Sequence, residues 1–206
     1  MSSDCPMDRD STCPMASHDQ PNPLNMMPSP NQQPSPGQKH SLSTDRASST
    51  IPMATKDQVW IYPSEQMFFN AMRRKKWDAN EEDMKVVVPI HNAVNEQCWK
   101  RILEWEAVNG TECKQPKLLK FQGKPRDYSP KARMFQLLGY KLPFDRHDWT
   151  VDRCGTLVTY VIDFYSGADD NPDSVSFYLD VRPSLSSLQG IKDRFYKFFK
   201  TGHGLI

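Results

Sequence analysis

Apolar residues recur at helical spacing in four segments between residues 62 and 200. The first, residues 62–77, begins near Ser64 and carries an apolar stripe of Met67, Phe68, Ala71 and Met72. The third, residues 128–140, has Ser129 as a capping residue, proline at its first position and Gly139 past its end. The last, residues 184–200, should cover a sheet with a stripe of Leu185, Leu188, Ile191, Phe195 and Phe198 or Phe199.

The second helical segment follows a β-branched run and has a histidine at its start. Pro89 should hold Val88 in an extended conformation, so we expect the helix to begin at Asn92, a good capping residue. From there a set of apolar side chains shares one helical face: Cys98, Trp99, Ile102, Leu103 and Trp105. His91 would then lie immediately before a helix N-terminus.

Three strand patterns follow the third helix. They cover residues 147–154, 156–165 and 174–183, with turn signals between them. In the third strand the apolar residues Val175, Phe177, Leu179 and Val181 alternate with Ser176, Tyr178, Asp180 and Arg182, so one face should be buried and the other wet. The expected fold class is α+β, a single domain in which several helices pack on an antiparallel strand meander.

Composition divides the chain into a tail and a domain. The first 59 residues contain no Phe, Trp or Tyr but nine of the seventeen prolines, so they offer little apolar surface to offset chain entropy. We therefore expect residues 1–56 to be a disordered tail and residues 57–206 to form one domain.

Charge excludes some partners and leaves others open. The formal net charge of +1 argues against nucleic acid as the main partner. Basic clusters at residues 73–76 and 192–200 could meet an acidic protein or an anionic membrane, although a plain solvated helix face is the preferred interpretation of each. No apolar run is long enough for a membrane span, and the acidic start resembles neither a secretory signal nor an Arg-rich mitochondrial presequence.

The five cysteines show neither a disulfide framework nor a zinc-binding spacing. Cys5 and Cys13 are distinctive because each opens the tripeptide CPM within the proline-rich tail. A cysteine thiolate followed by proline in a mobile segment suits heme iron, a soft-ligand site, while a neutral tail is the alternative.

His91 is the strongest candidate for a metal ligand. Before a helix N-terminus the local positive potential disfavours imidazolium and leaves a neutral ring with a free lone pair. A packing or capping role is the alternative for an isolated histidine. A single protein ligand makes a poor zinc site but suffices for heme, whose iron already has four porphyrin nitrogens.

Several long motifs resemble successive blocks of the holocytochrome c synthase family, the cytochrome c-type heme lyases. They are WIYPSEQMFFNAMRRK, IHNAVNEQCWKRILEWE, SPKARMFQLLGYKLPFDRHDWTVDRCG, YVIDFY and LDVRPSLSSL. The similarity spans residues 58–196, with the paired CPM tripeptides ahead of it in the position of the family's heme motifs. PFDRHDW and the pattern around IHN are the most specific parts.

The resemblance implies a carbon–sulfur lyase that attaches heme b covalently to the CXXCH segment of apocytochrome c, and possibly of apocytochrome c1. It also implies a peripheral protein on the mitochondrial inner membrane, facing the intermembrane space. His91, in the family's IHN motif, would be the axial ligand of the heme iron, with the substrate's own histidine on the other side. Such a sandwich would place the substrate thiols beside the heme vinyl groups.

Other residues receive weaker assignments. Glu96 could hydrogen-bond the His91 ring or a substrate amide, or simply complement the helix dipole. Asn92 and Trp99 are expected near the heme, although Trp99 equally suits a core. Propionate-binding candidates are Arg133, Arg146 and Arg153, each with a surface ion pair as its alternative. His147, between two acids, is expected to be structural.

Two other functions stay open at this point. A heme chaperone or sensor of the intermembrane space would bind heme without making thioethers, and an interaction scaffold would bind no heme. The sequence does not separate a cytochrome c client from cytochrome c1.

Overall fold

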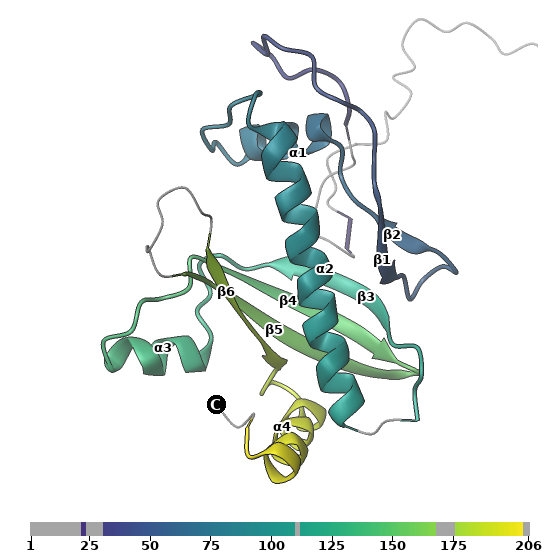
Figure 1. Cartoon of the computed structure of the whole chain (residues 1–206), viewed down its shortest axis with the longest axis vertical. Coiled ribbons are helices and arrows are strands. Elements are labelled where there is room, and N and C mark those ends of the chain that lie inside the picture. Colours follow the sequence, from purple (N-terminus) through teal and green to yellow (C-terminus); the bar gives the residue numbers. More distant parts are fainter. Residues whose placement is uncertain (1–21, 24–30, 110–111, 168–175, 204–206) are drawn as a thin grey trace, which may run out of the picture.

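The computed structural model describes residues 22–23, 31–109, 112–167 and 176–203 (Figure 1). Its helices and strands follow in the order β1 Ser48–Pro52, β2 Val59–Ile61, α1 Glu65–Arg74, α2 Met84–Val108, β3 Lys117–Gly123, α3 Pro130–Leu137, β4 Asp145–Arg153, β5 Thr156–Ser166, β6 Phe177–Pro183 and α4 Leu188–Thr201. The α+β class and the antiparallel meander are confirmed, since one sheet has the order β3-β4-β5-β6 with every neighbouring pair antiparallel.

Two of the helices begin at the serine caps that the sequence predicts. The Ser64 side chain accepts a hydrogen bond from the Met67 amide at the start of α1. At the start of α3, the Ser129 side chain accepts from the Ala132 amide in the same way. Gly139, just past α3, has a φ of 87°, the left-handed region that glycine adopts without strain.

The main core lies between α2 and one face of the four-stranded sheet, called here the inner face. Trp149 on β4 pairs directly with Tyr160 on β5, and both side chains are fully buried there. The buried face of α2 supplies the other half of the core with Cys98, Trp99, Ile102 and Trp105. This helical face is largely as predicted, although Leu103 is partly exposed. Figure 1 shows α2 lying across the strands.

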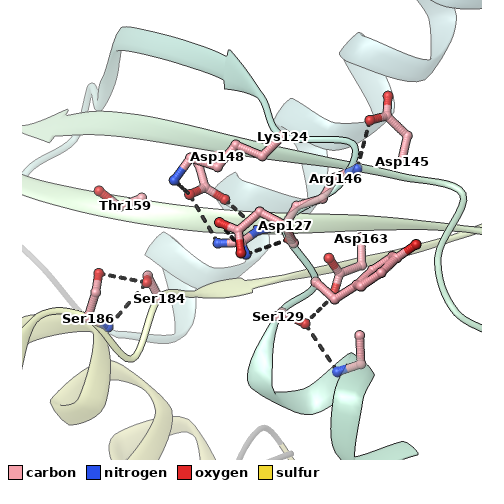
Figure 2. A network of polar contacts seen from close by, with 12 residues as sticks. Lys124, Asp127, Ser129, Asp145, Arg146, Asp148, Thr159, Asp163, Ser184 and Ser186 are labelled. Carbon is pink, nitrogen blue, oxygen red and sulfur yellow. Dashed lines mark hydrogen bonds and ion pairs between the residues drawn. The ribbon is translucent and has the colours of Figure 1, made fainter. Parts of the chain in front are cut away.

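The opposite, outer face of the sheet is only partly wet in the last strand, where Tyr178 is 64% exposed but the charged residues are covered, contrary to the sequence prediction. Arg182 of β6 is only 3% exposed and donates hydrogen bonds to Asp163, Asp180 and Ser129. Figure 2 shows part of this face, where Asp163 also accepts from Ser129 at the start of α3. The strand alternates as predicted, but paired charges and the segment before α3 cover Arg182 and most of Asp180 on its polar side.

The predicted tail boundary at residue 56 is wrong for the described part of that segment. β1 forms a hairpin with β2, Ile51 is buried in the main core, and Leu42 is buried against α1. Polar side chains also hold this segment in place, since the Asn70 amide donates to the carbonyls of Asn31 and Gln33. A prediction of disorder from low aromatic content fails for such a segment, because hydrogen bonds and a few aliphatic side chains hold the segment in place. Residues 1–21 and 24–30 lie outside the described residues.

The cysteines depart from the sequence prediction as well. Cys113 and Cys154 form a disulfide that ties the segment after α2 to the turn between β4 and β5. Their separation of 41 residues carries no local signal, which is why the sequence did not indicate the bond. Cys98 is a buried free thiol in the core.

The orientation of α4 is the largest departure from the predicted packing. The helix forms within the predicted segment, although it begins at Leu188, four residues later than the expected start at residue 184, and Ser187 caps it. However, the stripe expected to cover the sheet faces outward, with Leu188 80% and Phe199 81% exposed. Asp193 and Arg194 are buried instead, because Arg153 pairs with Asp193 and the Pro183 carbonyl accepts a hydrogen bond from Arg194.

Candidate functional site

His91 lies within α2, not before it. The helix begins at Met84, so Asn92 does not cap it and Pro89 sits inside it. Proline removes one backbone hydrogen bond, the one to the carbonyl of Lys85, which is an exposed residue. Burial of Met84 and Val88, at 1% and 6% exposure, offsets that loss and extends the helix backwards by two turns. Position at a helix N-terminus therefore cannot explain the state of His91.

Aromatic rings and amides surround the His91 imidazole instead. The Phe68 ring of α1 meets it edge to face with centroids 5.0 Å apart, and Tyr62 does so at 6.5 Å. Asn92 Oδ1 lies 3.3 Å from Nδ1. The Asn95 amide nitrogen lies 3.2 Å from Nε2 and 2.8 Å from the His91 carbonyl oxygen. This setting orients the ring and leaves it partly open to solvent.

Burial lowers the pKa of the His91 imidazole below its ordinary value of 6.5, and the nearby His147 and Lys75 act in the same direction. The contact with Asn92 opposes them without reversing the shift. At neutral pH the ring is thus uncharged, the form that can donate a lone pair to a metal. The sequence prediction of a neutral ring holds, with burial as its cause in place of the helix dipole.

Three ionisable groups from other elements converge on this region. His147 Nε2 lies 3.1 Å from Asp145 Oδ2, and its ring meets Phe164 edge to face. Lys75, one residue past α1, influences the pKa values of both His91 and Asp145, which places its charge near them. In the sequence, Lys75 is distinctive only as part of a basic cluster. Asn95 was not predicted as a site residue, because its spacing of four from His91 becomes meaningful only once His91 is helical.

Glu96 has partners other than His91. Its carboxylate accepts from the amide and hydroxyl of Thr50 and from the Tyr62 hydroxyl at 2.8 Å. Burial would raise the pKa of this carboxyl, but the hydrogen bonds from Thr50 and Tyr62 hold it below its ordinary value. Glu96 thus fastens β1 to α2 and holds Tyr62, the ring that meets the edge of His91. The expected direct contact with the histidine ring is absent.

Two predicted heme-binding residues lie elsewhere. Trp99 is 4% exposed and belongs to the main core. Arg153 is held between Glu106 and Asp193, with Nε 2.5 Å from Glu106 Oε2 and an amino nitrogen 2.7 Å from Asp193 Oδ2. Glu106 is 15 residues beyond His91 on α2, which amounts to about 22 Å along a helix. Arg153 is therefore committed to a buried ion pair at the other end of the helix.

The remaining arginine candidates also have partners within the fold. Arg146 forms ion pairs with Asp148 and Asp127 on the outer face of the sheet (Figure 2). Arg133 is exposed on α3 and donates to the carbonyl of Tyr128. Both guanidinium groups are thus engaged within the fold, although the Arg146 backbone amide donates to Asp145 Oδ1 in the region of His91. Cys5 and Cys13 lie outside the described residues.

Within the described part of the chain, no cluster of three or more His, Cys, Asp or Glu residues could hold a metal ion. This part also contains no helix that is long and apolar enough to cross a membrane. His91 thus offers one neutral nitrogen in an aromatic setting, which matches a metal that brings its other ligands with it.

The sequence model for "Cytochrome c/c1 heme lyase" matches residues 1–198. The holocytochrome c-type synthases of Bos taurus and Homo sapiens are 53% and 52% identical over 178 residues, 84% of this chain and 65% and 66% of theirs. A putative holocytochrome-c1 synthase of Schizosaccharomyces pombe is 54% identical over 164 residues, 76% of this chain and 75% of that protein.

This chain spans about two thirds of the length of the two mammalian relatives. No solved structure is significantly similar to it. The family match over residues 1–198 and the sequence identities above 50% nevertheless show that the chain belongs to the cytochrome c/c1 heme lyase family.

Proposed function

We propose that this chain attaches heme covalently to apocytochrome c, as a carbon–sulfur lyase that joins substrate thiols to the heme vinyl groups. The observation that carries the proposal is His91, a neutral, partly exposed imidazole held by Phe68, Tyr62 and Asn95. Family membership supports the same reaction class. Heme b is the substrate, and the client contributes its CXXCH segment.

In this proposal His91 donates a nitrogen lone pair to one axial position of the iron. The histidine of the client segment takes the other, so the two client cysteines lie beside the two vinyl groups. Holding thiol and vinyl at close range converts a bimolecular encounter into a near-intramolecular step. Phe68 and Tyr62 exclude water from one side of the ring and limit its rotation.

The proposed bond formation is an addition and needs no oxidant. Each reduced thiol adds across one vinyl double bond, so that sulfur bonds to the carbon nearer the porphyrin and the proton goes to the terminal carbon. Two additions give two thioethers with no leaving group. Among the described residues no carboxylic acid is hydrogen-bonded to the His91 ring as a dedicated proton donor, since Glu96 bonds to Thr50 and Tyr62.

The basic end of α1 is the proposed site for the heme propionates. Lys75 is exposed and acts electrostatically on His91, and Arg73, Arg74 and Lys76 adjoin it. Cations near His91 would neutralise the carboxylates that heme brings. This assignment replaces Arg133 and Arg153. Cys5 and Cys13, with their CPM tripeptides, are proposed to bind or deliver heme ahead of the chemical step.

The proposed location is the intermembrane-space side of the mitochondrial inner membrane, where the chain would act as a peripheral protein. Both cytochrome c and cytochrome c1 are candidate clients, because the relatives include a holocytochrome-c synthase of Saccharomyces cerevisiae and the putative holocytochrome-c1 synthase of Schizosaccharomyces pombe.

Coexpression tests the proposal directly. The chain should be produced in bacteria with apocytochrome c or apocytochrome c1, and the lysate stained for heme after denaturing electrophoresis. Heme that migrates with the client demonstrates thioether formation. Purified chain that carries heme but leaves the client unstained would instead indicate a heme chaperone or sensor, and failure of both would indicate a scaffold.

A further inference from the structure

Helix α4 packs against the protein through its polar side and turns its apolar side outward. On a wheel of 3.6 residues per turn, Gly190, Asp193, Arg194 and Lys197 share one face, at spacings of three and four. The first three are buried, and Lys197 is half-buried. The opposite face contains Leu188, Phe195 and Phe199, all exposed. This is the reverse of an ordinary amphipathic helix on a globular core.

Specific contacts on the polar side fix this orientation. Asp193 forms the ion pair with Arg153, and Arg194 Nε donates to the Pro183 carbonyl at 2.7 Å. The Lys197 ammonium lies 3.6 Å from the centre of the Trp105 ring. At Gly190 the helix approaches the chain so closely that a Cβ would overlap the carbonyl oxygen of Ser184. Rotating α4 to bury its apolar side would break all of these contacts.

The outward side combines aromatic rings with lysines and carries no exposed acid. Two further rings, Tyr196 and Phe198, widen the apolar face, and Leu185 continues it in the preceding turn. Lys192 and Lys200 are exposed beside these rings. Asp193, the single acidic residue of the helix, is buried in its ion pair. The last turns of α4 thus present Phe, Tyr and Lys together.

We propose that α4 lies in the surface of an anionic phospholipid membrane, with Leu188, Phe195 and Phe199 among the acyl chains and the lysines at the headgroups. Rings and leucines gain by leaving water, and lysine side chains reach back to anionic phosphates. Figure 1 places α4 at an edge of the molecule, where a flat surface can approach it. This inference rests on the membrane location in the proposed function and assigns the membrane contact to α4. It does not depend on the heme chemistry.

A second copy of the chain fits this face less well. In an isologous contact Lys192 and Lys200 would face the same lysines of the other copy, without an exposed carboxylate on α4 to pair with them. A lipid surface supplies the missing negative charge.

Flotation of the full chain with vesicles tests the proposal. Vesicles of phosphatidylcholine containing one-fifth cardiolipin should carry the chain upward in a density gradient. The Phe195→Ser/Phe199→Ser variant should partition at least about tenfold less, because two rings no longer enter the membrane. Lys192→Gln should lower partitioning about fivefold on anionic vesicles and leave the residual binding to pure phosphatidylcholine unchanged.

The matched control is Leu137→Ser/Leu138→Ser, which removes two exposed apolar side chains from the end of α3. Its partitioning should stay within about twofold of the parent. The inference is wrong if the Phe variant floats like the parent, if the α3 variant loses binding instead, or if the Phe variant only converts a dimer to a monomer in light scattering. Urea unfolding should show that both variants are as stable as the parent. Heme attachment in the coexpression assay is scored separately, so loss of flotation with normal thioether formation concerns the membrane alone.

Discussion

The two ends of the interface between α2 and the inner face of the sheet differ in chemistry. At the histidine end, His91 of α2 and His147 of β4 lie among aromatic rings, partly exposed. At the ion-pair end, Arg153 is held by Glu106 and Asp193 with almost no exposure. One end keeps an imidazole unprotonated and accessible, whereas at the other Arg153 is buried between two carboxylates that bond to it. A charged residue in a family motif is thus a poor guide to ligand binding when its partners are buried with it.

The two ends of the interface also differ in how firmly they are held. The ion-pair end also holds the Tyr160 hydroxyl, which donates to Glu106, and lies beside the disulfide that includes Cys154. The histidine end has no covalent tie among the described residues and relies on ring contacts and amides. We infer that the ion-pair end anchors α2 so that the histidine end can remain open to a large planar substrate.

The largest expected effect is loss of function at the histidine end. His91→Ala should purify without stoichiometric heme and should abolish cytochrome maturation, because the chain then offers no axial nitrogen at this position. Circular dichroism should still report a folded domain, since His91 lies outside the main core. His91→Met and His91→Cys should keep part of the heme, as both supply a soft ligand.

His147→Ala is the matched control for that substitution. Its side chain bonds Asp145 and packs on Phe164, so its removal should lower yield or stability before heme binding. A low-spin heme spectrum and normal maturation in His91→Ala, or selective heme loss in a well-folded His147→Ala, would show that the iron is held elsewhere.

At the ion-pair end the expected effect is on stability. Arg153→Ala would leave two buried carboxylates without their cation, which typically costs about 3–5 kcal/mol. The urea midpoint of the purified domain measures it. Arg101→Ala is the control, because its pair with Glu104 is about half exposed and should be worth under about 1 kcal/mol. Equal shifts for the two variants would mean that the ion-pair end does not anchor the helix.

The disulfide beside the ion-pair end should contribute somewhat less. Closing a loop of 41 residues stabilises a fold by up to about 4 kcal/mol in the chain-entropy account, and strain commonly lowers this. Reduction with dithiothreitol should therefore lower the urea midpoint of the parent. The Cys113→Ser/Cys154→Ser variant should start at the lower midpoint and show no further change on reduction. A reductant effect in that variant would point to another cause.

Sequence patterns predicted what is decided locally. Ser64 and Ser129 cap helices through side chains three residues from their partners, and the strand meander follows from alternation and turns. The start of α2 was missed because the proline rule is local, whereas burial of Met84 and Val88 depends on distant packing.

Two further errors have a common physical origin. The outward orientation of the apolar face of α4 could not be predicted from the sequence. Its polar side bonds to Arg153, which lies 40 residues earlier in the chain. For the same reason Arg153 was assigned to heme: neither Glu106 nor Asp193 is near it in sequence. His91 itself was selected from its expected position before a helix and then from a family motif, while its neighbours Phe68 and Tyr62 come from another part of the chain.

A smaller effect should appear in the pH dependence of stability at the histidine end. Burial lowers the pKa of His91 in the folded state, so below pH 6.5 the unfolded chain takes up its proton first. The contribution of His91 to stability is therefore fully present above pH 6.5 and declines as pH falls below that value. Urea unfolding at a series of pH values should show this slope, and His91→Gln should flatten it. An unchanged slope in His91→Gln would assign the titration to another group.

The smallest effect is expected from removing the hydroxyl of Tyr62. Two substitutions at this residue separate the role of its hydroxyl from the role of its ring. Tyr62→Phe keeps the ring against His91 and removes the hydrogen bond to Glu96, whose carboxylate still accepts from Thr50. Stability should fall by about 1 kcal/mol, and heme binding should stay near that of the parent. Tyr62→Ala removes the ring as well and should weaken heme binding, because His91 can then rotate. Measuring heme affinity in the two variants compares ring and hydroxyl directly; if Tyr62→Phe already lost heme as severely as Tyr62→Ala, the Glu96 hydrogen bond, and not the ring contact, would be what orients the histidine end.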